Sequence, residues 1–258
     1  MKIVLPYIPE RPAKPRNYGM TMVMDKGLSI REAEDFMSVG SEYTDFVKLG
    51  FGTSLITPDF GKKIKLYYNA GVKPYFGGTL FEAFIVRNMF DEFIEFVKKY
   101  NVEIVEVSDG SYDIEHPLKL EYIEKLSKLF TVISEVGSKK KEIVYSPDEW
   151  VAQMRSELDA GSVKVIAEAR ESGTTGIYNE DGSINHKIID AISTHVKLDN
   201  VIWEAPMKSQ QAWFIKHFGA NVNLGNIAPH EIIPLESLRC GLRGDTFFQF
   251  LPEHLKHS

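Results

Sequence analysis

The chain has 258 residues, of which 43% are hydrophobic and 26% charged, and its formal net charge is −6 at pH 7. This composition is ordinary for a folded globular protein and excludes a disordered chain, and no apolar run approaches the roughly 20 residues of a membrane-spanning helix. The negative charge, with basic residues dispersed along the chain, argues against nucleic-acid binding. The length suits one α/β barrel of roughly 250 residues or two smaller domains.

The cysteine content and the start of the chain indicate a cellular compartment. Cys240 is the single cysteine, which excludes an internal disulfide and any multi-cysteine metal site. The first apolar run is short and charges follow it at once, unlike a signal peptide. We therefore expect a cytoplasmic protein whose partners are small molecules or further copies of itself, with no nucleic-acid or membrane partner.

Proline recurs every third residue near the start of the chain, at Pro6, Pro9, Pro12 and Pro15. This period matches the three-residue turn of polyproline II and predicts an extended N-terminal arm over residues 1–18. Two alternatives remain open for this arm. It is either a loose tail or a segment that packs on a neighbouring subunit.

From residue 19 onward, short apolar runs alternate with longer amphipathic stretches. A helical pattern follows each run, including one long helix expected over 80–100. A Ser–x–x–Glu capping box predicts helix starts at Ser29 and Ser146, and a cap followed by proline predicts another at Thr57. The strands are expected over 19–25, 46–52, 72–78, 102–110, 131–137, 162–170, 200–206 and 221–228.

The order of these elements predicts the fold. Eight strand-plus-helix units, joined by connections too long for hairpins, favour parallel strands. We expect an α/β protein with a single (β/α)8 TIM-type barrel over residues 19–250 and a C-terminal tail over 251–258. A doubly wound open sheet is the main alternative. Its nucleotide-binding versions lose support because neither GxGxxG nor GxxxxGK[ST] is present.

Charged residues recur near the ends of the expected strands. Functional groups of a parallel barrel gather at the carboxyl ends of its strands, and side chains two residues apart on a strand share a face. If those faces point inward, we expect convergence at the barrel mouth of Lys48, Glu106, Glu135, Lys164, Glu168 and Glu204.

Several carboxylates cannot all stay ionised in a partly dry pocket without cations. Oxygen ligands without a histidine cluster favour Mg²⁺ over zinc. Glu106, Glu135 and Glu168 are the first candidates for metal ligands, followed by Asp109 and Glu204. The alternative is that these side chains form ion pairs that fill a polar barrel interior.

Glycine-rich loops follow several strands, and bare backbone amides at such loops can approach an anion. Gly225 and Asn226 follow the eighth strand, near the usual phosphate site of barrel enzymes. The loop "ESGTTG" over 171–176, which contains Ser172 and Gly173 and is preceded by Arg170, is a more specific signal. His230 lies just after the eighth strand and is the one histidine close enough to a strand end to be considered for the mouth, whereas the others fall in loops, helices or the tail.

The strand-end segments together resemble a known family. "YGMTMVMDKG", "DFVKLGFGTS", "GVKPYFGGTLFE", "VEVSDGS", "ISEVGSKK", "IAEARESGTTGIY", "IWEAP" and "NLGNI" occur in order over about 18–248 and look like phosphosulfolactate synthase of coenzyme M biosynthesis and its bacterial relatives. The resemblance implies a (β/α)8 barrel that adds sulfite to phosphoenolpyruvate with Mg²⁺, giving (2R)-phospho-3-sulfolactate. It also implies a homo-oligomer, a trimer in particular.

The resemblance suggests roles for individual lysines. A lysine just after the fifth strand, Lys139 or Lys140, is the candidate general acid, and Lys48 is the next candidate. The phosphate, carboxylate and sulfite groups would need cationic partners, for which Lys26, Lys48 and Arg170 are candidates.

Two further interpretations remain open. A phosphosugar aldolase or isomerase on the same barrel would use an interior lysine such as Lys48 or Lys164 for a Schiff base, or a carboxylate as a base. Arg239 and Arg243, from the last helix, would either reach the phosphate or form a salt bridge at the barrel base or a subunit contact.

Overall fold

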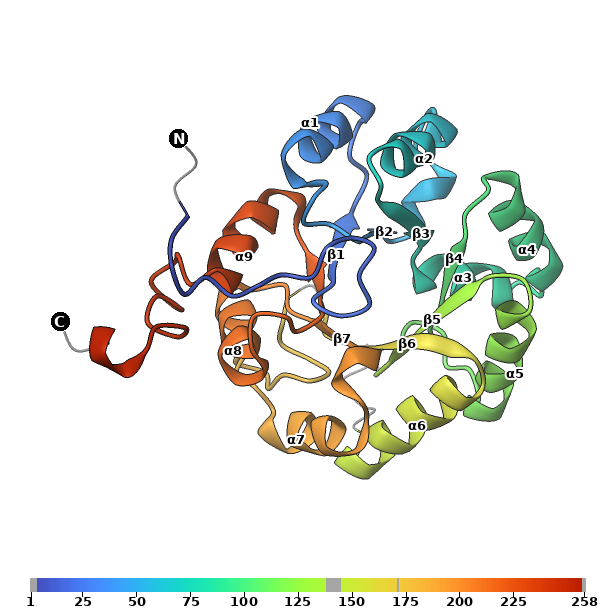
Figure 1. The fold of residues 1–258 in the computed structure, drawn as a ribbon. Helices are drawn as coiled ribbons and strands as arrows, with labels where there is room; N and C mark the ends of the chain where they lie inside the picture. Colours follow the sequence, from blue (N-terminus) through green and yellow to red (C-terminus); the bar gives the residue numbers. More distant parts are fainter. Residues whose placement is uncertain (1–3, 138–144, 171, 257–258) are drawn as a thin grey trace.

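The computed structural model describes residues 4–137, 145–170 and 172–256. Within them, eight parallel strands pair in chain order, and β1 pairs with both β2 and β8 to close the barrel. The predicted (β/α)8 fold is therefore confirmed (Figure 1). The strands are β1 (Thr21–Asp25), β2 (Phe46–Leu49), β3 (Lys73–Phe76), β4 (Ile104–Val107), β5 (Thr131–Val136), β6 (Ser162–Ala167), β7 (Val201–Glu204) and β8 (Leu224–Ile227).

The helices surround the barrel as an outer ring (Figure 1). Short 3-10 turns cover Thr53–Leu55, Leu198–Asn200, Pro229–Glu231 and Glu253–Leu255. The α-helices are α1 (Ile30–Gly40), α2 (Phe60–Asn69), α3 (Gly78–Ile85), α4 (Phe90–Lys99), α5 (His116–Ser127), α6 (Pro147–Asp159), α7 (His186–His195), α8 (Lys208–Phe218) and α9 (Ile232–Arg239).

Both predicted capping boxes are confirmed, and two other helix predictions are wrong. Ser29 and Ser146 each accept a hydrogen bond from the backbone of the glutamate three residues on, and that glutamate bonds back. The helix expected over 80–100 is two helices, because Asn88 adopts a left-handed φ of 56° between α3 and α4. The start expected at Thr57 lies instead at Phe60, after Asp59 with a φ of 53°.

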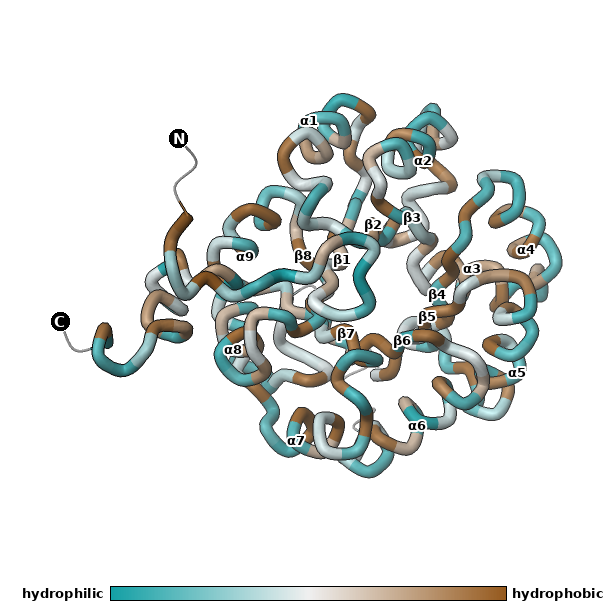
Figure 2. Tube along the Cα trace, viewed as in Figure 1, coloured by the Kyte–Doolittle hydropathy of each residue, from teal (hydrophilic) through white to brown (hydrophobic). Residues whose placement is uncertain are grey.

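The hydrophobic core lies between the barrel and the helices. Buried aromatic residues link the two layers, as where Trp203 of β7 stacks on Phe214 of α8 with ring centroids 5.2 Å apart. Figure 2 shows the hydrophobic strands at the centre and mixed colouring on the outer helices, as an amphipathic pattern requires. No helix in the described part of the chain is long and apolar enough to cross a membrane.

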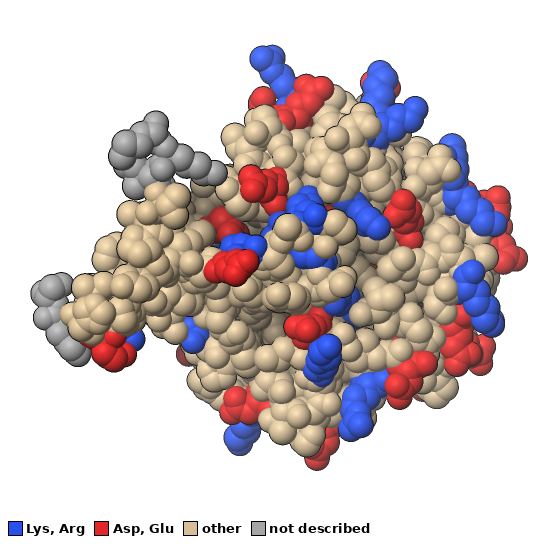
Figure 3. All heavy atoms as spheres, in the orientation of Figure 1, with Lys and Arg blue, Asp and Glu red and all other residues tan. Residues whose placement is uncertain are grey.

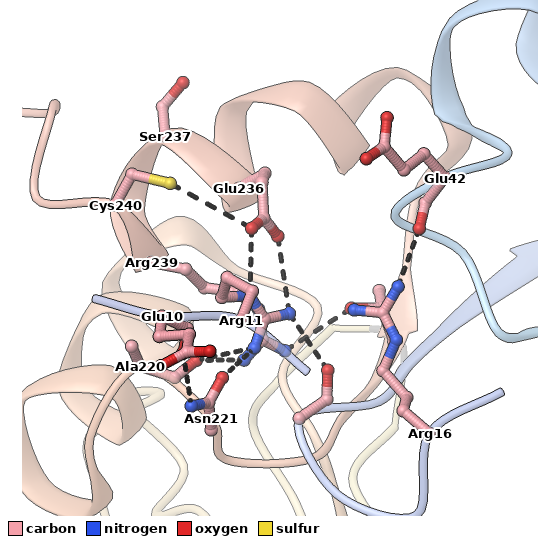
Figure 4. A network of polar contacts seen from close by, with 12 residues as sticks. Glu10, Arg11, Arg16, Glu42, Ala220, Asn221, Glu236, Ser237, Arg239 and Cys240 are labelled. Atoms are coloured by element: carbon pink, nitrogen blue, oxygen red, sulfur yellow. Dashed lines mark hydrogen bonds and ion pairs between the residues drawn. The ribbon is translucent and has the colours of Figure 1, made fainter. Parts of the chain in front are cut away.

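The N-terminal segment crosses the end of the barrel where the strands begin (Figures 1 and 4). Arg11 forms an ion pair of 2.9 Å with Glu236 of α9, and Arg16 forms one of 3.1 Å with Asp45. The carbonyl of Glu10 accepts a hydrogen bond of 2.9 Å from the side chain of Asn221. Residues 10–16 thus pack on their own barrel, an arrangement that neither sequence-based alternative anticipated.

Arg239 closes the same end of the barrel from α9 (Figure 4). Its guanidinium is fully buried and donates to the carbonyls of Ala220 at 2.6 Å and Val222 at 2.7 Å. Burial lowers the pKa of Arg239 to about 9. Of the two alternatives for Arg239, the one that has it reach a phosphate at the mouth is wrong. Its position agrees with the barrel base, but its acceptors there are backbone carbonyls and the Thr21 hydroxyl rather than the carboxylate of a salt bridge.

Candidate active site

A cavity of about 630 Å³ opens at the carboxyl ends of the strands. Its floor carries charged side chains from β2, β5 and β7, and its rim is built from the loops that follow the strands. The lining residues fall into a charged floor with Lys48, Glu135, Glu168 and Glu204, a wall with Met24, Gly50, Phe51, Gly77, Thr79, Gly110 and Ser111, and a rim with Ala169, Arg170, Ser172 and Asn226.

Lys48 is the centre of the floor. Its ammonium nitrogen lies 2.9 Å from Glu106 Oε1 and 2.8 Å from Glu135 Oε2. Glu204 Oε1 lies at 3.4 Å from the same nitrogen. All four side chains are buried, so strands β2, β4, β5 and β7 bring one cation and three carboxylates together inside the barrel.

Backbone amides hold two of these carboxylates in place. Gly78, the first residue of α3, donates its N–H to Glu106 Oε1 at 2.6 Å. Ala169 donates its N–H to Glu204 Oε2 at 2.9 Å. Such bonds favour an ionised carboxylate and fix its position before any substrate arrives.

Burial and mutual repulsion shift the titration of this cluster. Burial raises the pKa of Glu204 to about 7, although Lys48 opposes the shift. Burial likewise raises the pKa of Glu106. For Lys48, burial acts to lower the pKa, but the three carboxylates outweigh it and hold the pKa well above its usual value. The lysine therefore stays protonated at neutral pH, which disfavours the Schiff-base chemistry of the aldolase alternative.

The carboxylates offer oxygen ligands to a divalent cation. Glu135 and Glu168 both line the cavity. Glu106, the third predicted metal ligand, is not among the lining residues, and its Oε1 contacts Lys48 and the N–H of Gly78. Among the residues that the structure describes, no three acidic, histidine or cysteine side chains are grouped closely enough to hold a metal alone. This donor set fits Mg²⁺ in the way the ion commonly binds, through one or two carboxylates completed by water and substrate oxygens.

Three predicted anion-binding residues lie at the rim. Arg170 and Ser172 are exposed and line the cavity, and the hydroxyl groups of Ser172 and Thr174 lie 2.8 Å apart. Asn226 lines the cavity from β8 and has a φ of 57°. The amide of Asn226 donates to the carbonyl of Ala169 at 3.4 Å, which ties β8 to the loop after β6.

Three other predicted binding residues lie away from the cavity lining. Lys26 is exposed in the turn after β1 and lines a neighbouring hollow of about 510 Å³. Gly173 is buried, and its carbonyl accepts a bond of 2.9 Å from Gln210. At Gly225 a Cβ would come within 2.7 Å of Met22 Cε, so this glycine makes room for packing inside the barrel. Contact of these residues with substrate stays a prediction.

Lys164 does not join the floor, which corrects its expected place. Its ammonium donates to the carbonyls of Asn17 at 2.8 Å and Asp199 at 2.6 Å, at the opposite end of the barrel. Lys164 shares the inward face with Glu168, but four residues of strand separate them by about 13 Å. The alternation of side chains along a strand predicts which face Lys164 lies on, but not its position along the barrel axis.

Other charged candidates have partners elsewhere. Asp109 forms an ion pair of 2.9 Å with Lys119 of α5, so its carboxylate is engaged behind the strand. His230 is 81% exposed in the side chain and lies 3.9 Å from Glu231. Lys139 and Lys140, the candidate acids, lie outside the described residues.

Sequence reasoning missed several residues of the site. Thr79 and Ser111 line the wall. Both follow a strand, β3 and β4 respectively, so a search for hydroxyl groups as well as charges near strand ends would find them. Tyr178 donates its hydroxyl to the carbonyl of Glu204 at 2.6 Å. No sequence pattern indicates this contact, because Tyr178 comes from the long loop between β6 and α7.

Comparisons with known proteins agree with this fold. A family model for (2R)-phospho-3-sulfolactate synthase matches residues 9–245. The chain is 41% identical to phosphosulfolactate synthase of Bacillus subtilis, over 93% of this chain and 97% of that protein. It is 44% identical to phosphosulfolactate synthase of Methanocaldococcus jannaschii, over 89% and 94%. The YdjI aldolase of Escherichia coli K12 shares the fold, with a TM-score of 0.57, 11% identity and 91% of each chain covered.

Proposed function

The chain belongs to the phosphosulfolactate synthase family of carbon–sulfur lyases, and we propose that it adds sulfite to phosphoenolpyruvate to give (2R)-phospho-3-sulfolactate. The family resemblance of the strand-end segments is thereby confirmed. The observation that carries the proposal is a cavity with one buried lysine among carboxylates on its floor and anion-binding groups at its rim. Phosphoenolpyruvate has a phosphate and a separate carboxylate, so one of these groups could bind at the rim while the other lies over the floor.

The proposed reaction is a conjugate addition. The sulfur lone pair of sulfite forms a bond to the methylene carbon of phosphoenolpyruvate, and the electrons of the carbon–carbon double bond move onto the carboxylate. An enediolate-like intermediate results, and a proton from a general acid then reaches the carbon that bears the phosphate. Lys48 and its bound carboxylates would lie beneath this developing charge, while Arg170, Ser172 and Asn226 would bind oxygens at the rim.

We include Mg²⁺ in this proposal. Glu135 and Glu168 would hold it, because both line the cavity and offer carboxylate oxygens. When bound, the ion would neutralise the substrate carboxylate and the charge that develops there, as a Lewis acid does. Its binding would also reduce the excess of negative charge at the floor, where three buried carboxylates contact Lys48 and the buried Glu168 adds a fourth to the site.

The general acid is proposed to be Lys139 or Lys140. Both follow β5 by a few residues, and β5 ends beside Glu135 at the mouth. Gly137, with a φ of 133°, turns the chain there, and a Cβ on it would lie 2.8 Å from Glu168 Cβ. Gly137, which precedes both lysines in the sequence, thus lies next to Glu168 of the cavity floor.

The direct test is an assay of the purified chain with phosphoenolpyruvate, sulfite and Mg²⁺, in which formation of an organic phosphosulfonate is followed by ³¹P NMR. We expect product that depends on both substrates, disappears with a chelator and returns with excess Mg²⁺. Absence of product with either Mg²⁺ or Mn²⁺ would rule the function out.

The same assay tests the general acid. We expect either Lys139→Ala or Lys140→Ala to abolish turnover while circular dichroism shows an intact fold. If both variants turn over at the wild-type rate, the acid is elsewhere and Lys48 is the next residue to substitute.

We also propose that the protein forms a homo-oligomer, with a trimer as the form that the family resemblance suggests, and that it works in the cytoplasm. Both chain ends leave the barrel on the same side, beyond α8 and α9 (Figure 1). The side chains there are apolar and exposed, at 82% for Val4, 50% for Leu5 and 49% for each of Phe247 and Phe248. A second copy of the chain would cover them.

A further inference from the structure

Glu82 is a buried carboxylate that the proposed reaction does not use. It lies on α3, one turn after Gly78, and is 2% exposed. One of its oxygens accepts a hydrogen bond from the Ser108 hydroxyl. The other accepts two backbone N–H groups, from Ser111 at 2.7 Å and Tyr112 at 2.6 Å.

Among the residues that the structure describes, no lysine, arginine or histidine forms an ion pair with Glu82, and its hydrogen-bond donors are the three groups named above. A buried carboxylate without a cation is costly, and an apolar side chain of similar size would fill the same space at less cost. The three hydrogen bonds offset the free energy of burying the carboxylate only while the connection over residues 108–112 keeps the conformation that directs its donors at Glu82. Glu82 and this connection therefore fix one another.

The connection forms part of the cavity. Gly110 and Ser111 line the cavity wall. Because the N–H groups of Ser111 and Tyr112 are bound to Glu82, they are not available to a substrate while these bonds last, and the bonds fix how Gly110 and Ser111 line the cavity. Loss of Glu82 would release two amides and one hydroxyl, and the wall would rearrange.

Helix α3 joins this wall to the floor. Its first N–H, from Gly78, holds Glu106, and Glu106 pairs with Lys48. The contact is tight, since a Cβ on Gly78 would lie 2.1 Å from Ser108 Oγ and 2.9 Å from Glu106 Oε1. One short helix thus holds a floor carboxylate with its first turn and the cavity wall with its second.

We propose that Glu82 is a positioning residue that sets the wall formed by Gly110 and Ser111 and thereby the affinity for an anionic group of the substrate. The inference rests on the proposed function for its substrate. It assigns Glu82 to substrate affinity rather than to the chemical step, because Glu82 reaches the cavity only through this wall.

The test compares Glu82→Leu, Glu82→Gln and Ser108→Ala in steady-state kinetics with phosphoenolpyruvate and sulfite. We expect Glu82→Leu to raise the KM of one substrate at least tenfold and to change kcat less than threefold. Glu82→Gln should keep KM within threefold, because its amide oxygen still accepts both N–H groups and its NH₂ group can donate to Ser108. Ser108→Ala removes one of the three contacts and should raise KM less than Glu82→Leu does. Glu92→Leu, at an exposed position of α4, is the matched control and should keep the wild-type KM.

A second measurement reports on the wall without turnover. Hydrogen exchange in the peptide that covers 108–112 should be faster in Glu82→Leu and unchanged in Glu82→Gln. If Glu82→Leu does not fold, Glu82→Asp keeps the charge on a shorter side chain and should raise KM in the same way. Wild-type KM in folded Glu82→Leu or Glu82→Asp, or a fall in kcat with unchanged KM in either, would overturn the inference.

A failure of the proposed function would look different. In that case the wild-type chain forms no product from the two substrates. Calorimetric titration of wild-type and Glu82→Leu protein with phosphoenolpyruvate alone would then decide on Glu82, with equal affinities counting against its role.

Discussion

At the scale of single residues, the buried carboxylates of the cavity floor govern how stability depends on pH. The pKa of Glu204 is raised from 4.5 to about 7, mainly by burial. Between these values the folded state binds more protons than the unfolded state, so stability falls as the pH rises through this window. The shift corresponds to at most about 3 kcal/mol, at 1.36 kcal/mol for each pKa unit.

This shift leads to a prediction for the metal-free protein. We expect the free energy of unfolding to decrease from pH 5 to pH 7.5 and Glu204→Gln to flatten that slope, because the amide does not titrate. Urea unfolding at several pH values measures this. Glu34→Gln, an exposed position of α1, is the control and should keep the wild-type slope. An unchanged slope in Glu204→Gln would assign the pH dependence to another group.

The sequence could predict these floor residues because strand ends are readable from it. Glu135, Glu168 and Glu204 all follow apolar runs, and parallel strands bring such positions to one end of a barrel. It could not predict Glu82, because a glutamate inside an amphipathic helix normally faces water. It also misplaced Lys164, since alternation along a strand specifies a face and leaves the depth open.

At the scale of elements, Lys119 connects two helices, strand β5 and the loop after β4. It lies on α5, and its buried ammonium is 2.9 Å from Asp109 Oδ1 and 2.8 Å from Glu157 Oε1 of α6. The same nitrogen donates to the carbonyl of Glu135 on β5 at 2.7 Å. The ion pairs therefore join the helix layer to the strand that carries a floor carboxylate.

Removal of the lysine alone should be costly. We expect Lys119→Met to lower the free energy of unfolding by about 3 to 5 kcal/mol, because it leaves Asp109 and Glu157 buried without their cation. The double variant Lys119→Met, Glu157→Gln should recover most of this loss, since it removes one charge of each sign. Lys125→Met on the same helix breaks an exposed pair with Glu121 and should cost less than about 1 kcal/mol. Chemical denaturation measures all three, and equal losses in the single and double variants would contradict the argument.

The boundaries of elements were harder to predict from the sequence than their order. The capping boxes at Ser29 and Ser146 were readable because their hydrogen bonds are local. The break between α3 and α4 depends on Asn88 in a left-handed conformation, which asparagine tolerates but does not require. A capping box in the sequence therefore predicts a helix start reliably. The interruption at Asn88 is harder to predict, because it depends on tertiary packing.

At the scale of the whole molecule, the two ends of the barrel have different tasks. The carboxyl ends of the strands carry the cavity, and the opposite end is closed by Arg239 and by the contacts of Arg11 and Arg16. The proline period near the start indicated an extended segment but could not indicate what it packs on. Its contacts are made by arginine and backbone groups that lie far apart in the sequence, and these contacts become visible only in the folded barrel.

The apolar projection beyond α8 and α9 leads to the prediction for assembly. Figure 3 shows that its visible face carries few charged side chains. Exposed apolar patches of this kind mark contacts between proteins, and burial of each aromatic side chain contributes about 1.5 to 3 kcal/mol.

We expect light scattering of the purified protein to give a mass well above the 29.3 kDa of one chain. Phe247→Ser with Phe248→Ser should lower the mass to that of one chain, whereas Val39→Ser, at an exposed apolar position of α1, should leave it unchanged. A wild-type mass of 29.3 kDa at micromolar concentration would contradict the homo-oligomer, and an unchanged mass in the double variant would place its interface elsewhere on the barrel.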